Sequence, residues 1–258
     1  MGRRARAILP PIVWGAVFLG AWEWFVKWRN IKPYLLSPPS RIWSWLRVNR
    51  RFVIDAANVT GANALIGLVV GALLGLSVAL LAQRFRAVRD LISPLSAALN
   101  TMPIVALGPV FYNMFGTTSD VARRAVVALV VFFPVFVNVL KGLTQVDPIH
   151  EELMRSYAAG ESQILRRVRM PNAMPFLLTG LRISASLAVI AAVVVEYFGG
   201  PQSGLGQKTA SAMKQSLTAN GWAYIFAACL LGLAFYAVAL VIERFAVPWQ
   251  TRRSAPSP

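Results

Sequence analysis

The side chains that most often carry chemistry are few in this chain, and they form no recognisable catalytic set. The sequence has one histidine, one cysteine and ten carboxylates spread over many segments. No two of them show the spacing of a general acid and base, or of a nucleophile and its base. His150 has no second ligand nearby, and Cys229 lies inside an apolar run, where we expect a small buried hydrophobe. The sequence therefore predicts no enzyme, no metal site and no cofactor site.

Residues 199–209, GGPQSGLGQKT, have the glycines and the lysine of a phosphate-binding loop but not the spacing. A P-loop needs four residues between its two glycines and a lysine directly after the second. Here Gly206 is followed by Gln207, and Pro201 occupies the place of the first glycine. We expect a glycine-rich loop on the outer side of a membrane, with no ATP bound there.

Two ionisable side chains, Arg182 and Glu196, lie in or near apolar runs. Charges inside a membrane usually mark function or a partner. Arg182 could reach the interface by snorkelling, and Glu196 is near enough to the outer end of its run to contact water. We expect a structural role for each, with a gating role as the alternative, and Glu196 is a candidate lining residue of a pathway.

The densest charge in the chain lies in the stretch from Asp147 to Pro175. Asp147 can cap a helix that begins at Pro148, with two glutamates in its first turns. Ala158 to Gly160 should interrupt this helix, and ESQILRRVRM should restart it as far as Pro171. The pattern predicts two short helices with a corner of small residues, a shape that could enter a groove on a soluble partner.

The elements that carry these residues are mostly membrane helices. The chain is 57% hydrophobic and only 14% charged, with a mean hydropathy of +0.57. Apolar runs of about 20 residues are long enough to span a bilayer. We predict an all-α, polytopic protein with six spans, at residues 7–28, 58–82, 91–116, 125–140, 175–198 and 222–245.

Two of the spans carry specific packing signals. Gly67, Gly71 and Gly75 stack on one face of the second span and would allow close helix contact. The third span contains three prolines and should be broken or kinked. The residues at its expected break are candidates for lining a pathway, although a packing kink alone is an equal alternative: Asn100, Thr101 and Met102.

The basic residues predict how the chain is oriented. The net charge of +16 is spread over the connections between spans, which favours anionic lipid headgroups over nucleic acid as the partner. With both termini and the 147–175 stretch inside, the inner segments hold slightly more lysine and arginine than the outer ones. Residues 29–51 are basic and aromatic, and they predict either a helix lying in the interface or a solvated connection.

The charged stretch resembles the cytoplasmic loop of ABC importer membrane subunits, which reads Glu-Ala-Ala, three residues, Gly, nine residues, Ile, one residue, Leu-Pro. With Pro171 as the anchor, the glutamate falls on Glu152, the glycine on Ala158 and the isoleucine on Val168. Gly160 would supply the flexibility of the turn. Segments over residues 60–249, such as MPIVALGPVFYNMFG and VVVEYFGGPQSGLG, resemble the nitrate, sulfonate, taurine and thiamine-precursor branch of this family.

The resemblance implies a single permease domain over residues 1–258, with the type I ABC importer fold. Its core would lie at about 58–248, with an added first span at 7–28 and a coupling loop at 147–171. The loop residues expected to dock on an ATPase are Glu152, Ser156, Tyr157, Ala158, Ala159, Gly160, Glu161, Arg166 and Pro171.

The resemblance also implies the partners. A second permease, identical or related, would complete the pathway in the inner membrane of a prokaryote. Two cytoplasmic ATPase subunits would bind ATP and Mg²⁺, and an external binding protein would deliver a small solute. Sulfonates, nitrate-like anions and vitamin precursors such as a pyrimidine are open as substrates, with a slight preference for the last.

Two other classes of transporter remain alternatives. The first is a secondary transporter or channel that works without ATP and uses Glu196 and Arg182 as coupling charges. The second is the membrane subunit of an energy-coupling vitamin importer. That type presents two Ala-Arg-Gly helices, whereas this chain has one loop of a different pattern.

Overall fold

The computed structural model describes residues 3–85, 87–88, 90–92, 94, 103–201 and 203–247. The predicted pathway residues Asn100, Thr101 and Met102 lie outside these ranges. The predicted break of the third span at these residues therefore stays a prediction.

Every regular element in the described residues is a helix, which confirms the all-α prediction. In chain order they are α1 (Arg3–Trp28), α2 (Pro39–Val48), α3 (Arg50–Arg84), α5 (Ile104–Phe115), α6 (Asp120–Thr144), α7 (Pro148–Ser156), α8 (Glu161–Ile164), the π-helical turn η1 (Leu165–Arg169), α9 (Met170–Phe198), α10 (Leu205–Lys214) and α11 (Thr218–Ala246).

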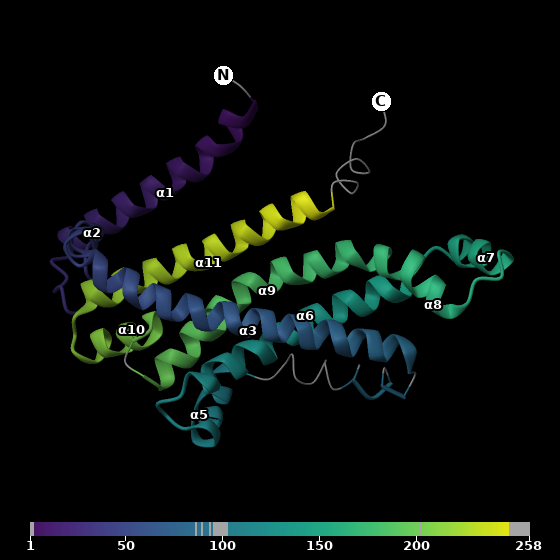
Figure 1. The fold of residues 1–258 in the computed structure, drawn as a ribbon. Helices are drawn as coiled ribbons and strands as arrows, with labels where there is room; N and C mark the ends of the chain where they lie inside the picture. The colour runs from purple at the N-terminus through teal and green to yellow at the C-terminus, as the bar shows by residue number, and fades with distance from the viewer. Residues whose placement is uncertain are drawn as a thin grey trace.

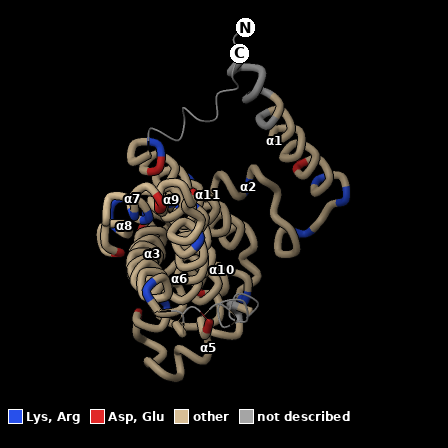
Figure 2. Tube along the Cα trace, turned by 90° about the vertical axis from the view of Figure 1, so that its right-hand side faces the viewer, with Lys and Arg blue, Asp and Glu red and all other residues tan. Residues whose placement is uncertain are grey.

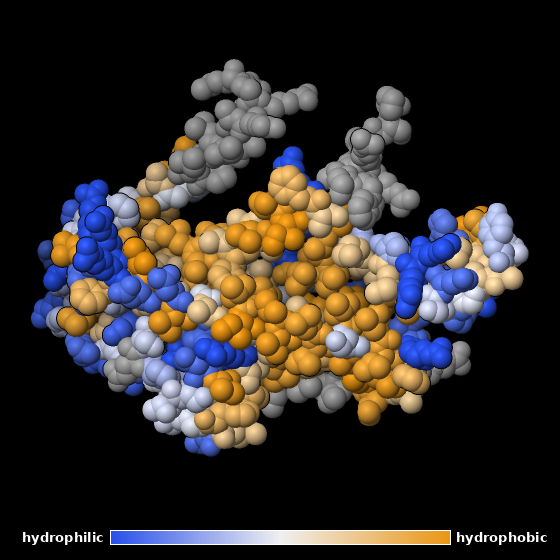
Figure 3. All heavy atoms as spheres, in the orientation of Figure 1, coloured by the Kyte–Doolittle hydropathy of each residue, from blue (hydrophilic) through white to orange (hydrophobic). Residues whose placement is uncertain are grey.

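The long helices α3, α6, α9 and α11 run side by side along one axis, and short helices lie at the two ends (Figure 1). α7 and α8 lie at one end, whereas α2 and α10 lie at the other. Apolar residues cover the middle of the face seen in Figure 3, and hydrophilic residues gather at both ends. This distribution matches the apolar core and polar borders of a bilayer.

Four helices in the described part of the chain are long and apolar enough to cross a membrane: Arg50–Arg84, Asp120–Thr144, Glu161–Phe198 and Thr218–Ala246. They correspond to four of the six predicted spans. The first predicted span is the helix α1, which leaves the bundle (Figure 2) and contacts it near its C-terminal end, where Val26 is 3% exposed. Of the third predicted span, the structure describes α5 and a few residues before it.

The predicted glycine face of the second span packs against α6. Gly67, Gly71 and Gly75 are all buried in α3. A Cβ at Gly71 would overlap the backbone oxygen of Ala128. A Cβ at Gly75 would lie 2.8 Å from the backbone oxygen of Phe132. The two helices approach so closely because these positions carry no side chain. The predicted role of the glycine face is confirmed.

The fifth span begins earlier than predicted. We expected a short helix to stop at Pro171, but the chain is helical from Glu161 to Phe198. Pro171 lies in the first turn of α9, directly after the π-helical turn η1. A proline ring would clash with the carbonyl four residues before it in a regular α-helix, and the wider π turn relieves this clash. The segment from Glu161 to Pro171 and the span therefore form one continuous element.

The burial of α11 differs from the prediction as well. Cys229 is exposed, so the expected burial of this thiol is wrong for the single chain. α11 lies on the outside of the bundle, and none of its most apolar 18-residue window is buried within the chain. Apolar side chains need no cover from protein where lipid surrounds them.

Candidate functional site

The α7–α8 corner is built by a helix end that forces one residue into the left-handed region. The N–H of Ala158 donates to the Arg155 carbonyl at 2.9 Å, and the N–H of Ala159 donates to the Met154 carbonyl at 3.0 Å. This pair of bonds is the Schellman motif, whose left-handed residue is usually glycine. Here that residue is Ala158, with φ of 54°. The left-handed residue of the turn therefore lies at position 158, where the loop pattern of ABC importer subunits has its glycine.

Gly160 does not supply the turn, contrary to the sequence interpretation. Its φ is −73°, an extended conformation open to any residue. Its N–H instead donates to the Gln163 side chain at 3.3 Å, where α8 begins. Both helix starts use local caps, since the Asp147 carboxylate accepts from the Ile149 N–H at 3.1 Å, as predicted.

One arginine joins α7 to the start of α9. Arg169 in η1 donates to both carboxylate oxygens of Glu151, at 2.8 and 3.0 Å. It also donates to Glu161 at 3.3 Å, and Arg155 contacts the same glutamate at 2.6 Å. Hydrogen bonds from Arg169 hold the pKa of Glu151 below its usual value. Charge-assisted hydrogen bonds thus hold α7 against the segment that leads into α9.

A second set of contacts fixes the corner to the bundle. The side-chain amide of Asn172 donates to the carbonyls of Gly142 and Gln145, at 2.8 and 3.0 Å. These carbonyls lie at the C-terminal end of α6, where carbonyls have no partner within the helix. α6 and α9 therefore meet at the base of the corner.

The outer surface of α7 carries apolar side chains that nothing in the described chain covers. Ile149, Leu153 and Tyr157 are 65%, 53% and 75% exposed, and their spacing of four places them on one face. No residue of α7 is buried. An apolar helix face at a hydrophilic end of the molecule is the form of a docking surface.

The structure brings most of the predicted loop residues together and separates two of them. Glu152 and Ser156 are exposed on α7, Tyr157 is exposed at its C-cap, and Ala158 to Glu161 form the corner. Arg166 and Pro171 instead line a groove against the membrane helices. Arg169, Ile149 and Leu153 were not among the predicted loop residues. The spacing of four in Ile149, Leu153 and Tyr157 could have revealed this face, but nothing distinguished Arg169 from its neighbouring arginines.

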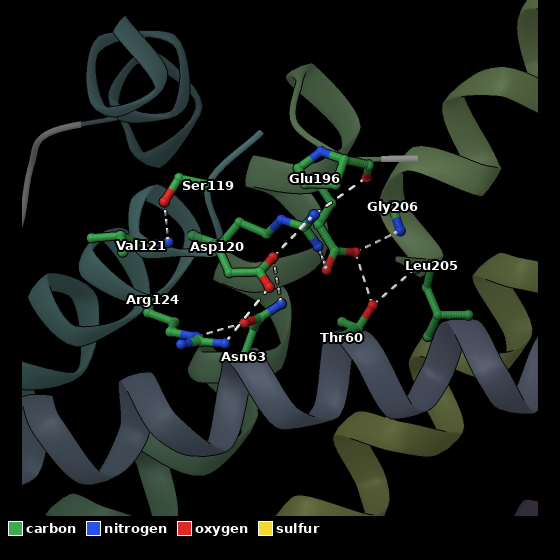
Figure 4. A network of polar contacts seen from close by, with 11 residues as sticks. Thr60, Asn63, Ser119, Asp120, Val121, Arg124, Glu196, Leu205 and Gly206 are labelled. Carbon is green, nitrogen blue, oxygen red and sulfur yellow. Dashed lines mark hydrogen bonds and ion pairs between the residues drawn. The ribbon is translucent and has the colours of Figure 1, made fainter. Parts of the chain in front are cut away.

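A buried polar network lies at the opposite end of the bundle (Figure 4). Glu196 accepts from the Thr60 hydroxyl at 2.8 Å, from Arg123 at 3.1 Å and from the Gly206 N–H at 3.0 Å. The Thr60 hydroxyl in turn accepts from the Leu205 N–H at 2.9 Å. Leu205 and Gly206 are the first two residues of α10, so the network caps this helix and joins it to α3, α6 and α9.

The expectation that Glu196 contacts water is wrong, because this side chain and that of Arg123 are fully buried. The tight turn before α10 brings Gly204 and Gly206 against the carboxylate and excludes water. A pathway between two permeases is not part of a single chain, so a lining role for Glu196 stays a prediction. Arg123 was not among the residues predicted from the sequence.

The network reaches the surface through Asp120. This carboxylate lies 3.3 Å from Arg123 and 3.6 Å from Arg124, and it is 42% exposed. Arg124 also donates to the buried Asn63 side chain at 2.9 Å. The spacing of Asp120, Arg123 and Arg124 on one helix was the available sequence signal.

Arg182 has a partner too. It donates to Glu243 of α11 at 2.9 Å, and the side chains are 32% and 16% exposed. The pair joins α9 to α11, which supports the structural role that we expected for Arg182. In the described residues, no three histidine, cysteine or carboxylate side chains are grouped as metal ligands.

The chain matches one protein family over most of its length. Residues 67–252 match the family described as binding-protein-dependent transport system inner membrane component. The formylaminopyrimidine transport permease protein of Halalkalibacterium halodurans is 32% identical over 253 residues, which are 97% of this chain and 100% of that protein. The putative aliphatic sulfonates transport permease protein of Bacillus subtilis is 30% identical over 188 residues, which are 73% of this chain and 67% of that protein.

Solved structures share the fold. A chain of an amino acid ABC transporter has a TM-score of 0.63 and 18% identity, and the match covers 79% of this chain and 97% of that one. A chain of the inward-facing MetNI methionine ABC transporter has a TM-score of 0.64 and 19% identity, with 76% and 96% covered. The predicted resemblance and the predicted type I importer fold are confirmed.

Proposed function

Because this chain belongs to the family of binding-protein-dependent transport system inner membrane components, we propose that it is the permease subunit of an ATP-driven importer. In this proposal the chain forms the solute pathway across the membrane, and a partner subunit hydrolyses ATP. The observation that carries the proposal is the exposed apolar face of α7, at the end of the bundle where α6 and α9 meet.

The mechanism follows from the way α7 is attached. Its apolar face, with Leu153 and Tyr157, enters a groove on a cytoplasmic ATPase. Arg169 ties α7 to the start of the 38-residue helix from Glu161 to Phe198. When the ATPase subunits close on ATP, the displacement of α7 passes directly into a membrane-spanning helix. A rigid connection is required for this step, because a flexible loop would absorb the motion.

The proposal includes the remaining partners and the orientation. A second permease, identical or related, completes the pathway, and two ATPase subunits bind ATP and Mg²⁺. The α7/α8 end and both termini face the cytoplasm. An external binding protein docks at the opposite end, where the buried network around Glu196 holds α10 in place.

For the substrate we propose a small heterocyclic vitamin precursor of the pyrimidine type. The support is the relative named as a formylaminopyrimidine permease, which aligns with nearly the whole chain. Uptake of a labelled pyrimidine precursor by cells that express the complete transporter tests this choice, and a sulfonate serves as the competing solute.

The coupling role is tested with surface variants of α7. The permease is co-expressed with an ATPase subunit of an ABC importer from the same organism, and co-purification and ATP hydrolysis are measured. We expect Leu153→Asp and Tyr157→Asp to lose the ATPase, because burial of a charge in an apolar groove is strongly unfavourable. Leu35→Asp, at another exposed apolar residue in the connection between α1 and α2, is the matched control and should retain it.

Two results would contradict the proposal. One is equal recovery of the ATPase with all three variants. The other is uptake into liposomes that contain only this chain and a proton gradient, which would favour the ATP-independent alternative.

A further inference from the structure

An apolar groove of about 390 Å³ lies on the bundle near its α7/α8 end, between α3, α6 and α9. Leu76 and Leu80 of α3 form one wall, and Val139 and Leu143 of α6 lie between the two walls. These residues belong to helices that cross the membrane. The groove is therefore part of the apolar region of the molecule, within reach of the bilayer.

The wall formed by α9 is apolar along the membrane and ends on a cation. Leu177, Met174 and Met170 line the groove in that order toward the α7/α8 end, and Arg166 lines it one turn further. The apolar part rises by about 10 Å, at 1.5 Å per helical residue. Met170 and Met174 are 42% and 43% exposed. Unbranched methionine side chains adapt to an occupant of irregular shape.

The wall formed by α3 has the same order of side chains. Arg84 follows Leu76 and Leu80 at intervals of four residues, so the three lie on one helix face. It is exposed and lies in the last turn of α3, at the same end of the bundle as Arg166. The α9 wall thus ends on a guanidinium that lines the groove, and α3 carries a second guanidinium one turn beyond its last lining residue, Leu80.

These two arginines differ from their neighbours in their partners. Arg155 and Arg169 pair with Glu161 and Glu151 within the loop. In the part of the chain that the structure describes, neither Arg84 nor Arg166 forms an ion pair with a carboxylate. The end of the groove therefore carries positive charge that an anion can balance.

We propose that this groove binds an anionic phospholipid, with one acyl chain between α3 and α9 and the phosphate at the end that carries Arg84 and Arg166. The occupant must be apolar along its length, anionic at one end and supplied by the bilayer, and an anionic lipid has all three properties. Basic pockets between membrane helices are known to hold such headgroups. A second copy of the chain could fill the apolar part, but it would leave the arginines without an anion.

The site also bears on the coupling loop. Arg166 and Arg169 belong to the same π-helical turn, and Arg169 holds Glu151 of α7. A lipid phosphate bound to Arg166 would therefore stiffen the turn from which α7 is held. The inference requires only that the chain spans a membrane, and it does not depend on the ATPase partner.

Native mass spectrometry of the full-length protein tests the proposal. The detergent-purified protein is incubated with phosphatidylglycerol or with phosphatidylcholine of the same chain length, and bound lipid is counted. We expect preferential retention of phosphatidylglycerol. Arg166→Gln should weaken it about fivefold, the contribution of one basic residue near an anionic surface.

Two further variants separate a groove from a charged surface. Arg167→Gln removes the same charge from the next residue, whose side chain does not line the groove. It should leave lipid retention unchanged. Met174→Trp should fill the groove and release the lipid although both arginines are kept. Inorganic phosphate at the lipid concentration should displace nothing, because it has no chain to bury.

The proposal is overturned if Arg166→Gln and Arg167→Gln weaken binding equally, if phosphatidylcholine is retained equally well, or if phosphate displaces the lipid. It is also overturned if Met174→Cys, in a Cys229→Ala background, forms a disulfide between two copies. That result would identify a second copy as the occupant. Since the readout is bound lipid, each outcome leaves the proposed coupling role unaffected.

Discussion

Arg123 and Glu196 form an ion pair of 3.1 Å in which neither side chain has any exposed surface. The pair joins α6 to α9 and, through the Gly206 N–H and the Thr60 hydroxyl, also holds α10 and α3. A buried ion pair is strongly destabilising when only one partner is removed, because the other charge stays in a medium of low dielectric constant. Loss of the Glu196 charge alone should therefore destabilise the fold.

Glu196→Gln should destabilise the protein by about 3 kcal/mol, the lower end of the range for removing one partner of a buried pair, since it leaves the buried Arg123 charge with only the partly exposed Asp120 carboxylate as a counter-ion. The measurement is thermal unfolding in one detergent. Arg155→Gln, which breaks an ion pair whose side chains are 57% and 50% exposed, is the control and should cost less than about 1 kcal/mol. The double variant Arg123→Met/Glu196→Gln should recover part of the loss. Equal effects of the two single variants would contradict the role assigned to the pair.

Ala158→Gly should stabilise the α7–α8 corner by about 1 kcal/mol. A side chain with a Cβ is strained at a φ of 54°, and glycine is not. Ala158→Val should loosen the corner, because a β-branched residue tolerates this conformation poorly. Amide hydrogen exchange of α7 reports the change directly.

Gly160→Ala is the matched control for the corner. Its φ of −73° suits any residue, and no atom lies within 4 Å of the added Cβ. Exchange rates in α7 should therefore stay as they are. If Gly160→Ala disturbed the corner and Ala158→Val did not, the turn would depend on Gly160 and not on Ala158.

Gly71→Ala should destabilise the contact between α3 and α6 by about 1–3 kcal/mol, the range for overpacking in a tight interior. The new Cβ would overlap a backbone oxygen of α6, which cannot rotate away. Thermal unfolding is again the measurement. In Gly61→Ala the new Cβ would lie 3.5 Å from Leu231, an ordinary contact, so this variant should behave like the parent protein. A loss of stability at both sites would indicate a general effect of helix glycines.

The contact between Glu151 and Arg169 should depend on pH. The hydrogen bonds from Arg169 lower the pKa of Glu151 in the folded protein, so the contact is fully stabilising above the ordinary pKa of a glutamate. The stabilisation is lost as the pH falls from that value through the lowered one. Cysteine cross-linking between α7 and α9 at a series of acidic pH values would follow the separation of the two helices.

Glu151→Gln provides the comparison for the pH series. It carries no titratable carboxylate, so the acid-dependent part of the separation should be absent. An identical acid profile in the parent protein and in this variant would mean that another group controls the corner.

The sequence was sufficient wherever one segment determines its own structure. Asp147 caps the helix at Pro148, and Gly67, Gly71 and Gly75 form a packing face, because both features depend on residues a few positions apart. The long apolar runs predicted helices for the same reason. The interruption at Ala158 to Gly160 was also correct, although its geometry comes from Ala158 rather than Gly160.

Contacts between distant segments could not be predicted in this way. Glu196 is buried because Arg123, 73 positions earlier, and Thr60, 136 positions earlier, supply its hydrogen bonds. No local pattern carries that information. Likewise, Arg166, Arg167 and Arg169 look equivalent in the chain, yet only Arg169 among them contacts glutamates and only Arg166 lines the groove.

The sequence by itself thus determined the membrane helices, the α7–α8 corner and the family, since hydrophobic period, caps and motif spacing are all encoded locally. The tertiary structure decided which charges are buried as pairs, which arginine holds the corner and where a groove meets a cation. Such relationships depend on the packing of α3, α6 and α9 in space, because a charge acquires its partner only when separate helices come together.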